Sequence, residues 1–433
     1  MNGLIALSAL LAFVFPSPAL CADLPSMRAA DIPADMSVPP APEAAPPADR
    51  YTKDWTVLIY VSARNNLGIE AIADVNEMEA AGTTGRVNVV AELGRIPGKP
   101  VFNPFASVQE EPPPQNDWTG SRRFLIRKDS DPLLVTSPVL SHDPDADLGD
   151  WRRLADFIKW GKSNFPARRY LLIVGGHGSG WRGVKPPPRN KGISYDEVSK
   201  NHISPAELAQ AIKAGGGVDV YASDACLMQT FEVIYDLRGA AEYVVGSQET
   251  TPGTGYNYEL LLTRLDANPG DARTAADIVV DAFVDYYHGQ KQRSVTMSIA
   301  RPDRADALAA KLDAFARLVE ASPADLKLFN QKKFGLRNFE DEDARDLYQL
   351  MKMYYENSAT PAVGEAAREV ILALAEGVVV RNEAKGYKSK EAWGMSIHFP
   401  YFQMNYKERY EYLTLSRDTR WDEMIKASVN APK

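Results

Sequence analysis

The chain has 433 residues, of which 45% are hydrophobic and 24% charged, a composition typical of a globular protein with enough apolar material for a sizeable core. Its formal net charge of −8 argues against nucleic-acid binding, which usually requires a basic face, and the sequence has no polybasic run that would attract anionic lipid.

The predicted elements begin with an export signal at residues 1–22. Its apolar stretch at 4–15 is too short to span a bilayer as a helix, and small residues up to Ala22 follow it, as a signal peptidase requires. The segment lacks an early Lys or Arg, and Cys21 would also fit a lipoprotein box, although Leu20 before it fits poorly. We expect export to the periplasm or the extracellular space, and no transmembrane segment.

Residues 23–50 are rich in Pro and Ala and contain no aromatic side chain. Such a composition cannot bury a core, so the segment is predicted to be an extended linker or a pro-segment, with order beginning at Trp55. If the signal is removed after Cys21 or Ala22, Cys226 is the one cysteine left, and no internal disulfide can form. A lone thiol is either a small buried hydrophobe or a reactive group.

From Trp55 onward, apolar runs typical of strands buried on both faces alternate with segments of helical spacing. This alternation implies right-handed crossovers and an α/β fold with a mainly parallel central sheet between helices. The chain after about residue 270 is predicted to be largely helical. Strands are predicted at 56–62, 86–93, 122–127, 170–174, 218–222, 243–247, 295–300 and 393–399, and helices at 67–80, 151–162, 205–214 and 227–237.

Two reactive side chains come directly after predicted strands. His177 follows one strand within Gly-Gly-His-Gly, and Cys226 follows another within Ser-Asp-Ala-Cys. Because the functional crevice of such a sheet lies beyond the carboxyl ends of its strands, neighbouring strands would place the imidazole beside the thiol. An imidazole that takes the thiol proton makes thiolate available near neutral pH. The amides of Gly178 and Cys226 would then face an oxyanion, and the positive end of the helix predicted at 227–237 would favour the thiolate.

Longer segments carry a family resemblance: YLLIVGGHGSGW, VDVYASDACLMQTFEV followed by VVGSQETTPGTGY, and WTVLIYVSARNNL and AWGMSIHFPY nearer the two ends of the chain. In these segments the chain resembles the clostripain family of cysteine peptidases, which belongs to the same clan as caspases, legumain and gingipains. The resemblance implies a caspase-like α/β/α sandwich as a peptidase domain at 51–300. It also implies a largely helical C-terminal extension at 301–433, packed on the peptidase core. The chemistry of such a peptidase requires no cofactor.

The resemblance further implies a catalytic dyad of Cys226 and His177 and cleavage after Arg or Lys. In the family, the acid two residues before the nucleophile helps to form the S1 pocket, and Asp224 has that position here. A partly enclosed carboxylate gives a charge-assisted bond to a basic side chain, whereas an Asp at this place could instead cap the following helix. Where the family often has Ser-Glu-Glu, this chain has Ser-Gln-Glu, of which Ser247 and Glu249 are assigned to the pocket.

Many members of the family are made as inactive precursors and cut between the two catalytic segments. The stretch at 184–193 has that place here, and its basic residues Lys185, Arg189 and Lys191 would suit a basic-specific enzyme that cuts itself. The sequence therefore predicts a zymogen that is self-processed between its two catalytic residues.

Two further stretches resemble ligand-binding motifs but lack features that those motifs require. The glycines at 178, 180 and 183 match a dinucleotide-binding fingerprint, but a Pro-rich stretch follows where the fingerprint requires a helix. Asp143, Asp145 and Asp147 have the spacing of a calcium loop, but the glycine is one place late and the Glu of the twelfth position is missing. Calcium stays a candidate cofactor because dependence on it occurs in the family. The sequence shows no pattern of metal-binding His or Cys residues, so no metal ligands are assigned.

The sequence as a whole predicts an exported cysteine endopeptidase that acts on proteins or peptides with Arg or Lys at the cleavage site. Two rival interpretations stay open. One is a transpeptidase or ligase on the same dyad, because an acyl-enzyme can meet an amine instead of water. The other is an inactive, peptidase-like scaffold that binds without cleaving.

Overall fold

The structure is a computed structural model that describes residues 52–96, 118–184, 192–288, 290, 294–386 and 391–432. The predicted export signal at 1–22 and the predicted linker at 23–50 lie outside the described residues. The chain from Thr52 onward forms one compact unit. In the part of the chain that the structure describes, no helix has both the length and the apolar character needed to cross a membrane.

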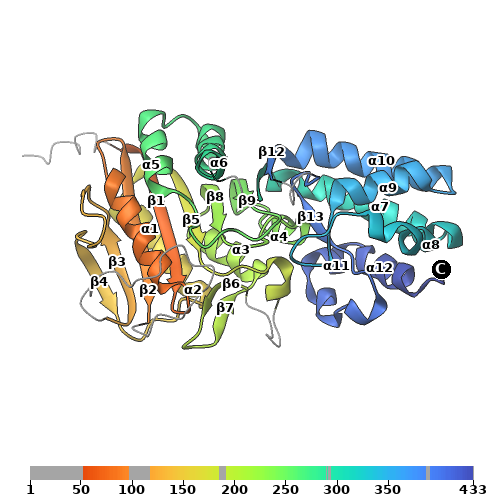
Figure 1. Cartoon of the computed structure of the whole chain (residues 1–433), viewed down its shortest axis with the longest axis horizontal. Coiled ribbons are helices and arrows are strands. Elements are labelled where there is room, and N and C mark those ends of the chain that lie inside the picture. The colour runs from red at the N-terminus through yellow and green to blue at the C-terminus, as the bar shows by residue number, and fades with distance from the viewer. Residues whose placement is uncertain are drawn as a thin grey trace, which may run out of the picture. The chain divides into compact units, whose positions relative to one another are not determined.

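A nine-stranded sheet organises this unit, with the strand order β12-β10-β9-β8-β5-β1-β2-β3-β4 (Figure 1). The inner strands from β9 to β2 are parallel to one another, whereas β10 and β12 at one end and β3 and β4 at the other pair antiparallel. The strands are β1 (Lys53–Ala63), β2 (Val87–Arg95), β3 (Gly120–Leu125), β4 (Val139–Asp143), β5 (Ala167–Gly175), β8 (Val218–Asp224), β9 (Ala241–Gly246), β10 (Val295–Ala300) and β12 (Val379–Lys385).

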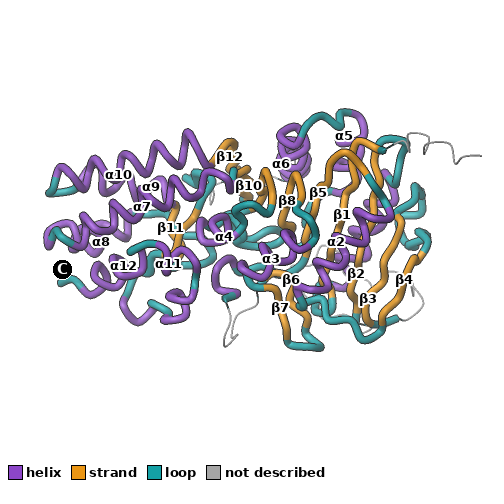
Figure 2. The backbone as a smooth tube through the Cα atoms, turned by 180° about the vertical axis from the view of Figure 1, so that it is seen from behind, coloured by secondary structure: helices purple, strands orange, loops and turns teal. Residues whose placement is uncertain are grey.

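The sheet is buried on both faces. Leu58 and Tyr60 of β1 belong to one hydrophobic core, and Val57 and Ile59 belong to another, because successive side chains of a strand point to opposite faces. Helices lie in front of the sheet in both opposite views (Figures 1 and 2), so the predicted α/β/α arrangement is confirmed. One face is covered by α1 (Gly68–Ala81), α5 (Tyr258–Ala267) and α6 (Ala272–His288), and the other by α2 (Trp151–Asn164), α3 (Pro205–Ala214) and α4 (Phe231–Asp236).

Local sequence fixes several helix ends. Asp150 accepts a hydrogen bond from the backbone N–H of Arg152 at the start of α2. At the start of α3, Ser204 and Glu207 form a reciprocal capping box, and Pro205 occupies the first helical position, where its missing N–H costs nothing. These signals are readable in the sequence, and α3 begins and ends where the sequence predicts.

The helix predicted at 227–237 is wrong at its start. The helix α4 begins only at Phe231, with Thr230 as its N-cap, and Leu227 has a φ of +63°. The backbone N–H groups of Leu227 and Gln229 donate instead to carbonyl groups in the loop after β9, over 3.2 and 3.0 Å. These bonds hold the backbone after Cys226 in an irregular conformation, so α4 does not begin at the thiol as predicted.

The C-terminal third extends the same sheet and the same core. β12 pairs antiparallel with β10, and the helices of this third share one hydrophobic core with α2, α3 and α4. The strand predicted at 393–399 is shorter, since only β13 (Ser396–His398) pairs with β11 (Ala344–Asp346). The helices are α7 (Ala305–Glu320), α8 (Pro323–Lys332), α9 (Leu347–Asn357), α10 (Pro361–Ala373), α11 (Thr414–Asp418) and α12 (Trp421–Asn430).

Several short elements connect these layers. They are the hairpin of β6 (Ile193–Asp196) and β7 (Asn201–Ile203), the 3-10 turns Gly180–Gly183, Pro302–Arg304, Lys333–Gly335, Gln403–Asn405 and Glu408–Tyr412, and the π-helical turn Leu374–Val378.

The turn Gly180–Gly183, which follows His177, is anchored in the C-terminal third. The Trp181 ring lies 4.5 Å from the His398 ring, measured between centroids, and both side chains are buried. Arg182 forms ion pairs with Asp341 and Asp343. The segment that carries His177 is therefore held by residues that come much later in the chain.

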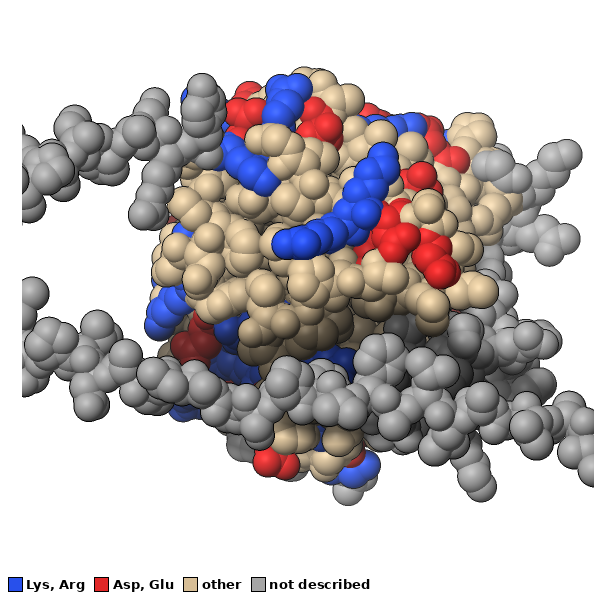
Figure 3. All heavy atoms as spheres, turned by 90° about the vertical axis from the view of Figure 1, so that its left-hand side faces the viewer, with Lys and Arg blue, Asp and Glu red and all other residues tan. Residues whose placement is uncertain are grey.

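The opposite end of the sheet, at β3 and β4, carries mixed charge. In the described part of the face in Figure 3, basic and acidic side chains are interspersed rather than gathered by sign. At this end of the sheet, Arg153 of α2 lies 2.6 Å from Asp143 of β4.

Candidate active site

The register of two neighbouring strands brings His177 and Cys226 to one place. β5 and β8 pair in parallel, with Gly175 opposite Asp224, and each reactive residue comes two positions after its member of this pair. Both residues line one cavity of about 160 Å³ at the carboxyl ends of the strands. The cavity is lined by Val61, Leu67, Glu70, Ala71, Asp74, Gly175, Gly176, His177, Asp224, Ala225, Cys226, Thr251, Pro252, Gly253 and Gly255.

The Cys226 thiol is partly buried and is hydrogen-bonded to one backbone segment. The N–H of Thr251 donates to Sγ over 3.3 Å, and Sγ lies 3.8 Å from the carbonyl oxygen of the same residue. Burial raises the pKa of the thiol, the bond from Thr251 lowers it, and the carboxylates of Asp224 and Glu249 raise it further. With its pKa raised, the thiol needs a base to become a nucleophile.

His177 is oriented by a side chain that the sequence did not reveal. Its Nε2 lies 2.7 Å from Oδ1 of Asn66, in the turn between β1 and α1. An amide oxygen can only accept, so Nε2 carries the proton in this pair and Nδ1 keeps the lone pair that a base requires. The neighbouring Asn65 fixes the turn by donating to the carbonyl groups of Ser62 and Tyr195, over 3.0 and 2.8 Å.

Gly178 lies against the backbone of the nucleophile. A Cβ atom at this position would lie 2.4 Å from the carbonyl oxygen and 3.1 Å from the nitrogen of Cys226, so only glycine fits. Gly176 has a φ of +131°, which an L side chain rarely adopts. The glycines of Gly-Gly-His-Gly thus let two backbone segments approach closely beside the thiol.

Asp224 is buried beside the thiol. It is 8% exposed, and its Oδ2 accepts hydrogen bonds from the N–H of Tyr256 and the hydroxyl of Tyr258, over 3.1 and 3.0 Å. Burial raises the pKa of Asp224 to about 6, although both bonds favour the ionised form. Its side chain does not cap α4, whose N-cap is Thr230, so the capping alternative is wrong.

The other two residues assigned to the S1 pocket, Ser247 and Glu249, are not among those that line the cavity. Ser247 lies 2.8 Å from the Thr296 hydroxyl. The Glu249 carboxylate accepts from the N–H groups of Thr250 and Glu340, over 2.9 and 3.0 Å, and lies 3.7 Å from the guanidinium of Arg337. These contacts shape the loop after β9 and connect it to the C-terminal third.

The three basic residues predicted as self-cleavage sites, Lys185, Arg189 and Lys191, lie outside the described residues. The described segments on either side come together, because a Cβ atom at Gly183 would lie 2.4 Å from Cα of Gly192.

The aspartates of the candidate calcium loop have protein partners. Asp143 is paired with Arg153, and Asp147 accepts from the Ser199 hydroxyl and the Asn201 amide, over 2.7 and 2.8 Å. Over the described ranges, no group of three or more His, Cys, Asp or Glu side chains is arranged to hold a metal ion.

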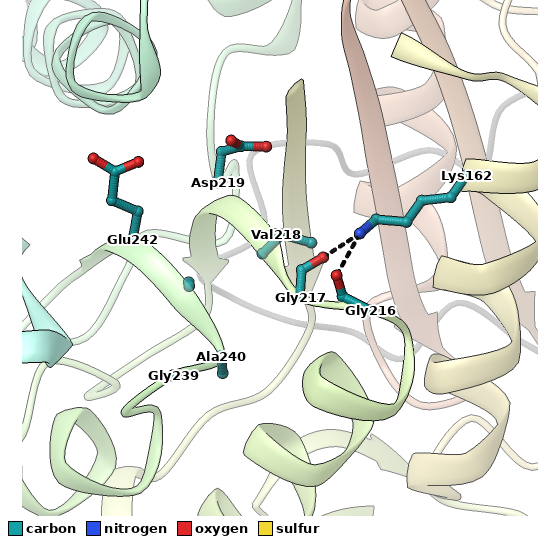
Figure 4. A pocket seen from close by; sticks show the side chains of 9 residues that line it. Lys162, Gly216, Gly217, Val218, Asp219, Gly239, Ala240 and Glu242 are labelled. Carbon is teal, nitrogen blue, oxygen red and sulfur yellow. Dashed lines mark hydrogen bonds between the residues drawn. The ribbon is translucent and has the colours of Figure 1, made fainter. Parts of the chain in front are cut away.

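A second cavity, of about 400 Å³, lies at the opposite ends of β8 and β9 (Figure 4). Lys162 donates to the carbonyl groups of Gly216 and Gly217 there, over 2.8 and 2.5 Å. Its described lining contains no thiol and no imidazole. The cavity with His177 and Cys226 is therefore the candidate active site.

Comparisons with known proteins agree with this geometry. The sequence profile of the clostripain family matches residues 59–427. Clostripain from Hathewaya histolytica is 28% identical over 236 residues, which cover 50% of this chain and 43% of that protein, so the match spans less than half of the relative's length.

Two solved structures share the fold. A secreted C11 cysteine protease from Bacteroides thetaiotaomicron, in complex with an irreversible peptide inhibitor, superposes with a TM-score of 0.61 at 19% identity, covering 86% of this chain and 99% of that one. An inactive zymogen C11 protease from Parabacteroides distasonis gives a TM-score of 0.58 at 19% identity, covering 85% and 98%. The fold, the order of the motifs and the family match together show that the chain belongs to the clostripain family of cysteine peptidases.

Proposed function

We propose that this peptidase is an exported endopeptidase that cleaves after Arg or Lys, with Cys226 as nucleophile and His177 as base. The observation that carries the proposal is the shared cavity, in which a thiol, an imidazole with its own orienting partner and a buried carboxylate lie together. Clostripain-family membership supports the reaction class. The buried Asp224 supports a basic residue at the cleavage site, because a carboxylate binds a guanidinium or ammonium group through a charge-assisted bond.

The reaction follows from these groups. Nδ1 of His177 takes the proton of Cys226, and the thiolate attacks the carbonyl carbon that follows the basic residue. The N–H groups of Gly178 and Cys226 stabilise the oxyanion. The imidazolium then gives its proton to the departing amine, which leaves a thioester on Sγ. In the second half, His177 takes a proton from water, the hydroxide attacks the thioester, and the thiol is regenerated.

Two further parts of the proposal rest on sequence and relatives. Export is supported by the signal-like residues 1–22 and by the secreted protease among the structural neighbours. Self-processing at Lys185, Arg189 or Lys191 is supported by their place between the dyad residues and by the zymogen among the neighbours.

The test is hydrolysis of fluorogenic peptides that end in Arg, Lys, Asp or Leu, by the purified protein and by Cys226→Ala. Cleavage after Arg or Lys that disappears in the variant is the expected result. Cleavage after Asp or Leu would contradict the assignment of Asp224. No cleavage, even with added calcium and after limited trypsin nicking, would contradict the endopeptidase itself. Mass spectrometry of the incubated wild-type chain, with the Lys185, Arg189 and Lys191 triple Ala variant as control, tests self-processing.

A further inference from the structure

One wall of the active-site cavity is made by α1, a helix far from the dyad in the sequence. Glu70 and Asp74 of this helix line the cavity together with Asp224. The two residues are four positions apart, so their side chains lie on the same face of the helix. Asp224 at the end of β8 is the third carboxyl group that lines this cavity.

These carboxyl groups have no cationic partner in the protein as described. Glu70 is 7% exposed and Asp224 is 8% exposed, and Asp74 is half-buried. No Lys or Arg among the described residues pairs with any of the three, and the described lining of the cavity contains neither residue type. Nor does another described residue donate a hydrogen bond to the carboxyl group of Glu70. Burying carboxylates without a counter-charge lowers the folding stability. A site that contains them is therefore suited to bind a cation that the substrate supplies.

We propose that Glu70 and Asp74 are specificity-determining residues that complete, with Asp224, a three-carboxylate S1 pocket, and that this pocket selects Arg over Lys at the cleavage site. This inference rests on the proposed function and identifies the residues that bind the substrate side chain at the cleavage site. A guanidinium presents five N–H donors in a planar fork and can bridge carboxylates that belong to different elements. An ammonium is a compact point charge that pairs fully with fewer of them.

The empty pocket also has a defined electrostatic state. Burial raises the pKa of Asp74, and the neighbouring Asp224, Glu77 and Glu70 raise it further. Burial likewise raises the pKa of Glu70. Both carboxyl groups therefore bind a proton more readily in the empty pocket than they would in water, and a bound guanidinium favours their ionised form.

The test compares Glu70→Gln and Asp74→Asn with wild type on three substrates that differ only in the last residue: Arg, Lys and citrulline, the neutral isostere of Arg. Glu77→Gln is the matched control. It removes one charge from the same helix, its side chain is not among those lining the cavity, and a Gln oxygen can still accept the Tyr258 N–H that Glu77 accepts over 2.9 Å. The rate of Cys226 alkylation by iodoacetamide, which does not use the S1 pocket, reports on an intact dyad.

We expect each cavity variant to lower kcat/KM for the Arg substrate by about 10-fold or more, the loss typical of a hydrogen bond to a charged group. The loss for Lys should be smaller, cleavage after citrulline should not fall, and alkylation should match wild type. Because Glu77 acts on Asp74 only through its charge, Glu77→Gln should lose less Arg cleavage than either cavity variant. Equal losses on all three substrates would overturn the inference and make the residues structural. Unchanged Arg cleavage would overturn it alone, whereas a wild-type protein that cleaves none of the three would overturn the proposed function as well.

Discussion

Replacing Asp224 by Asn tests two effects of its buried charge separately. One is the loss of folding stability that burying the charge causes, and the other is the binding of a basic substrate side chain. Both hydrogen bonds to this side chain reach the same oxygen, Oδ2, from the N–H of Tyr256 and the hydroxyl of Tyr258. An Asn that places its Oδ1 there keeps both bonds. The substitution removes only the negative charge. That charge binds the basic side chain of the substrate, and burying it is unfavourable for folding.

The size of the effect on stability follows from the pKa of Asp224, which burial raises to about 6. An unfolded Asp titrates near 3.9, so the shift is about two units and the ionised form costs about 2–3 kcal/mol of folding free energy. The folded pKa is the higher one, so the folded protein binds more protons between about pH 4 and pH 6. Stability contributed by this group is present below that window and is lost as the pH rises through it.

The Asn variant should therefore be more stable than wild type at pH 8, by up to about 3 kcal/mol, and should have no such advantage at pH 4. At the same time, kcat/KM for an Arg substrate should fall by about 100-fold, because a buried charge-assisted bond is lost. Urea unfolding of both proteins at each pH, in a Cys226→Ala background that prevents self-cleavage, measures the first effect. An Asn variant that is less stable than wild type at pH 8, or one that still cleaves after Arg at the wild-type rate, would refute the reasoning.

Three further predictions follow from the same cavity. For the wild-type protein, KM for an Arg substrate should rise as the pH falls through about 6, because Asp224 becomes protonated; a citrulline substrate should lack this rise, and identical profiles would contradict it. Asn66→Ala should lower kcat by about 10- to 100-fold with little change in KM, since it frees the imidazole of His177, and single-turnover kinetics with unchanged acylation would contradict that role. Gly178→Ala should abolish cleavage and iodoacetamide labelling together, because its methyl group meets the Cys226 backbone; labelling at the wild-type rate would show that the loop can adjust.

Much of the fold was predictable because it rests on local signals. The apolar run of β1 and the capping box at Ser204 specify a buried strand and a helix start without any knowledge of their neighbours. The meeting of His177 and Cys226 was predictable too, since both follow strands whose carboxyl ends meet at the same edge of the sheet.

What escaped prediction depends on contacts between distant segments. Asn66 lies in a segment that carries the family resemblance, but nothing in the sequence shows that its amide meets His177. Asp74 carries no motif, and it lines the cavity because of where α1 packs. The late start of α4 had the same origin, since the N–H of Leu227 is taken by the Glu249 carbonyl rather than by a helix. β12 was missed because it is a half-buried edge strand with the polar sequence VVRNEAK, which lacks the apolar run of an inner strand.

The anchoring of the turn after His177 has a consequence for how this protein evolves. Trp181 packs on His398, and Arg182 pairs with Asp341 and Asp343. The surroundings of His177 therefore depend partly on residues among the last hundred of the chain. A substitution on one side of these contacts leaves an unmatched ring or an unpaired buried charge on the other. We therefore expect substitutions in these two parts of the chain to occur together. A C-terminal third exchanged between relatives should function only when its residue at position 398 packs against the residue at position 181.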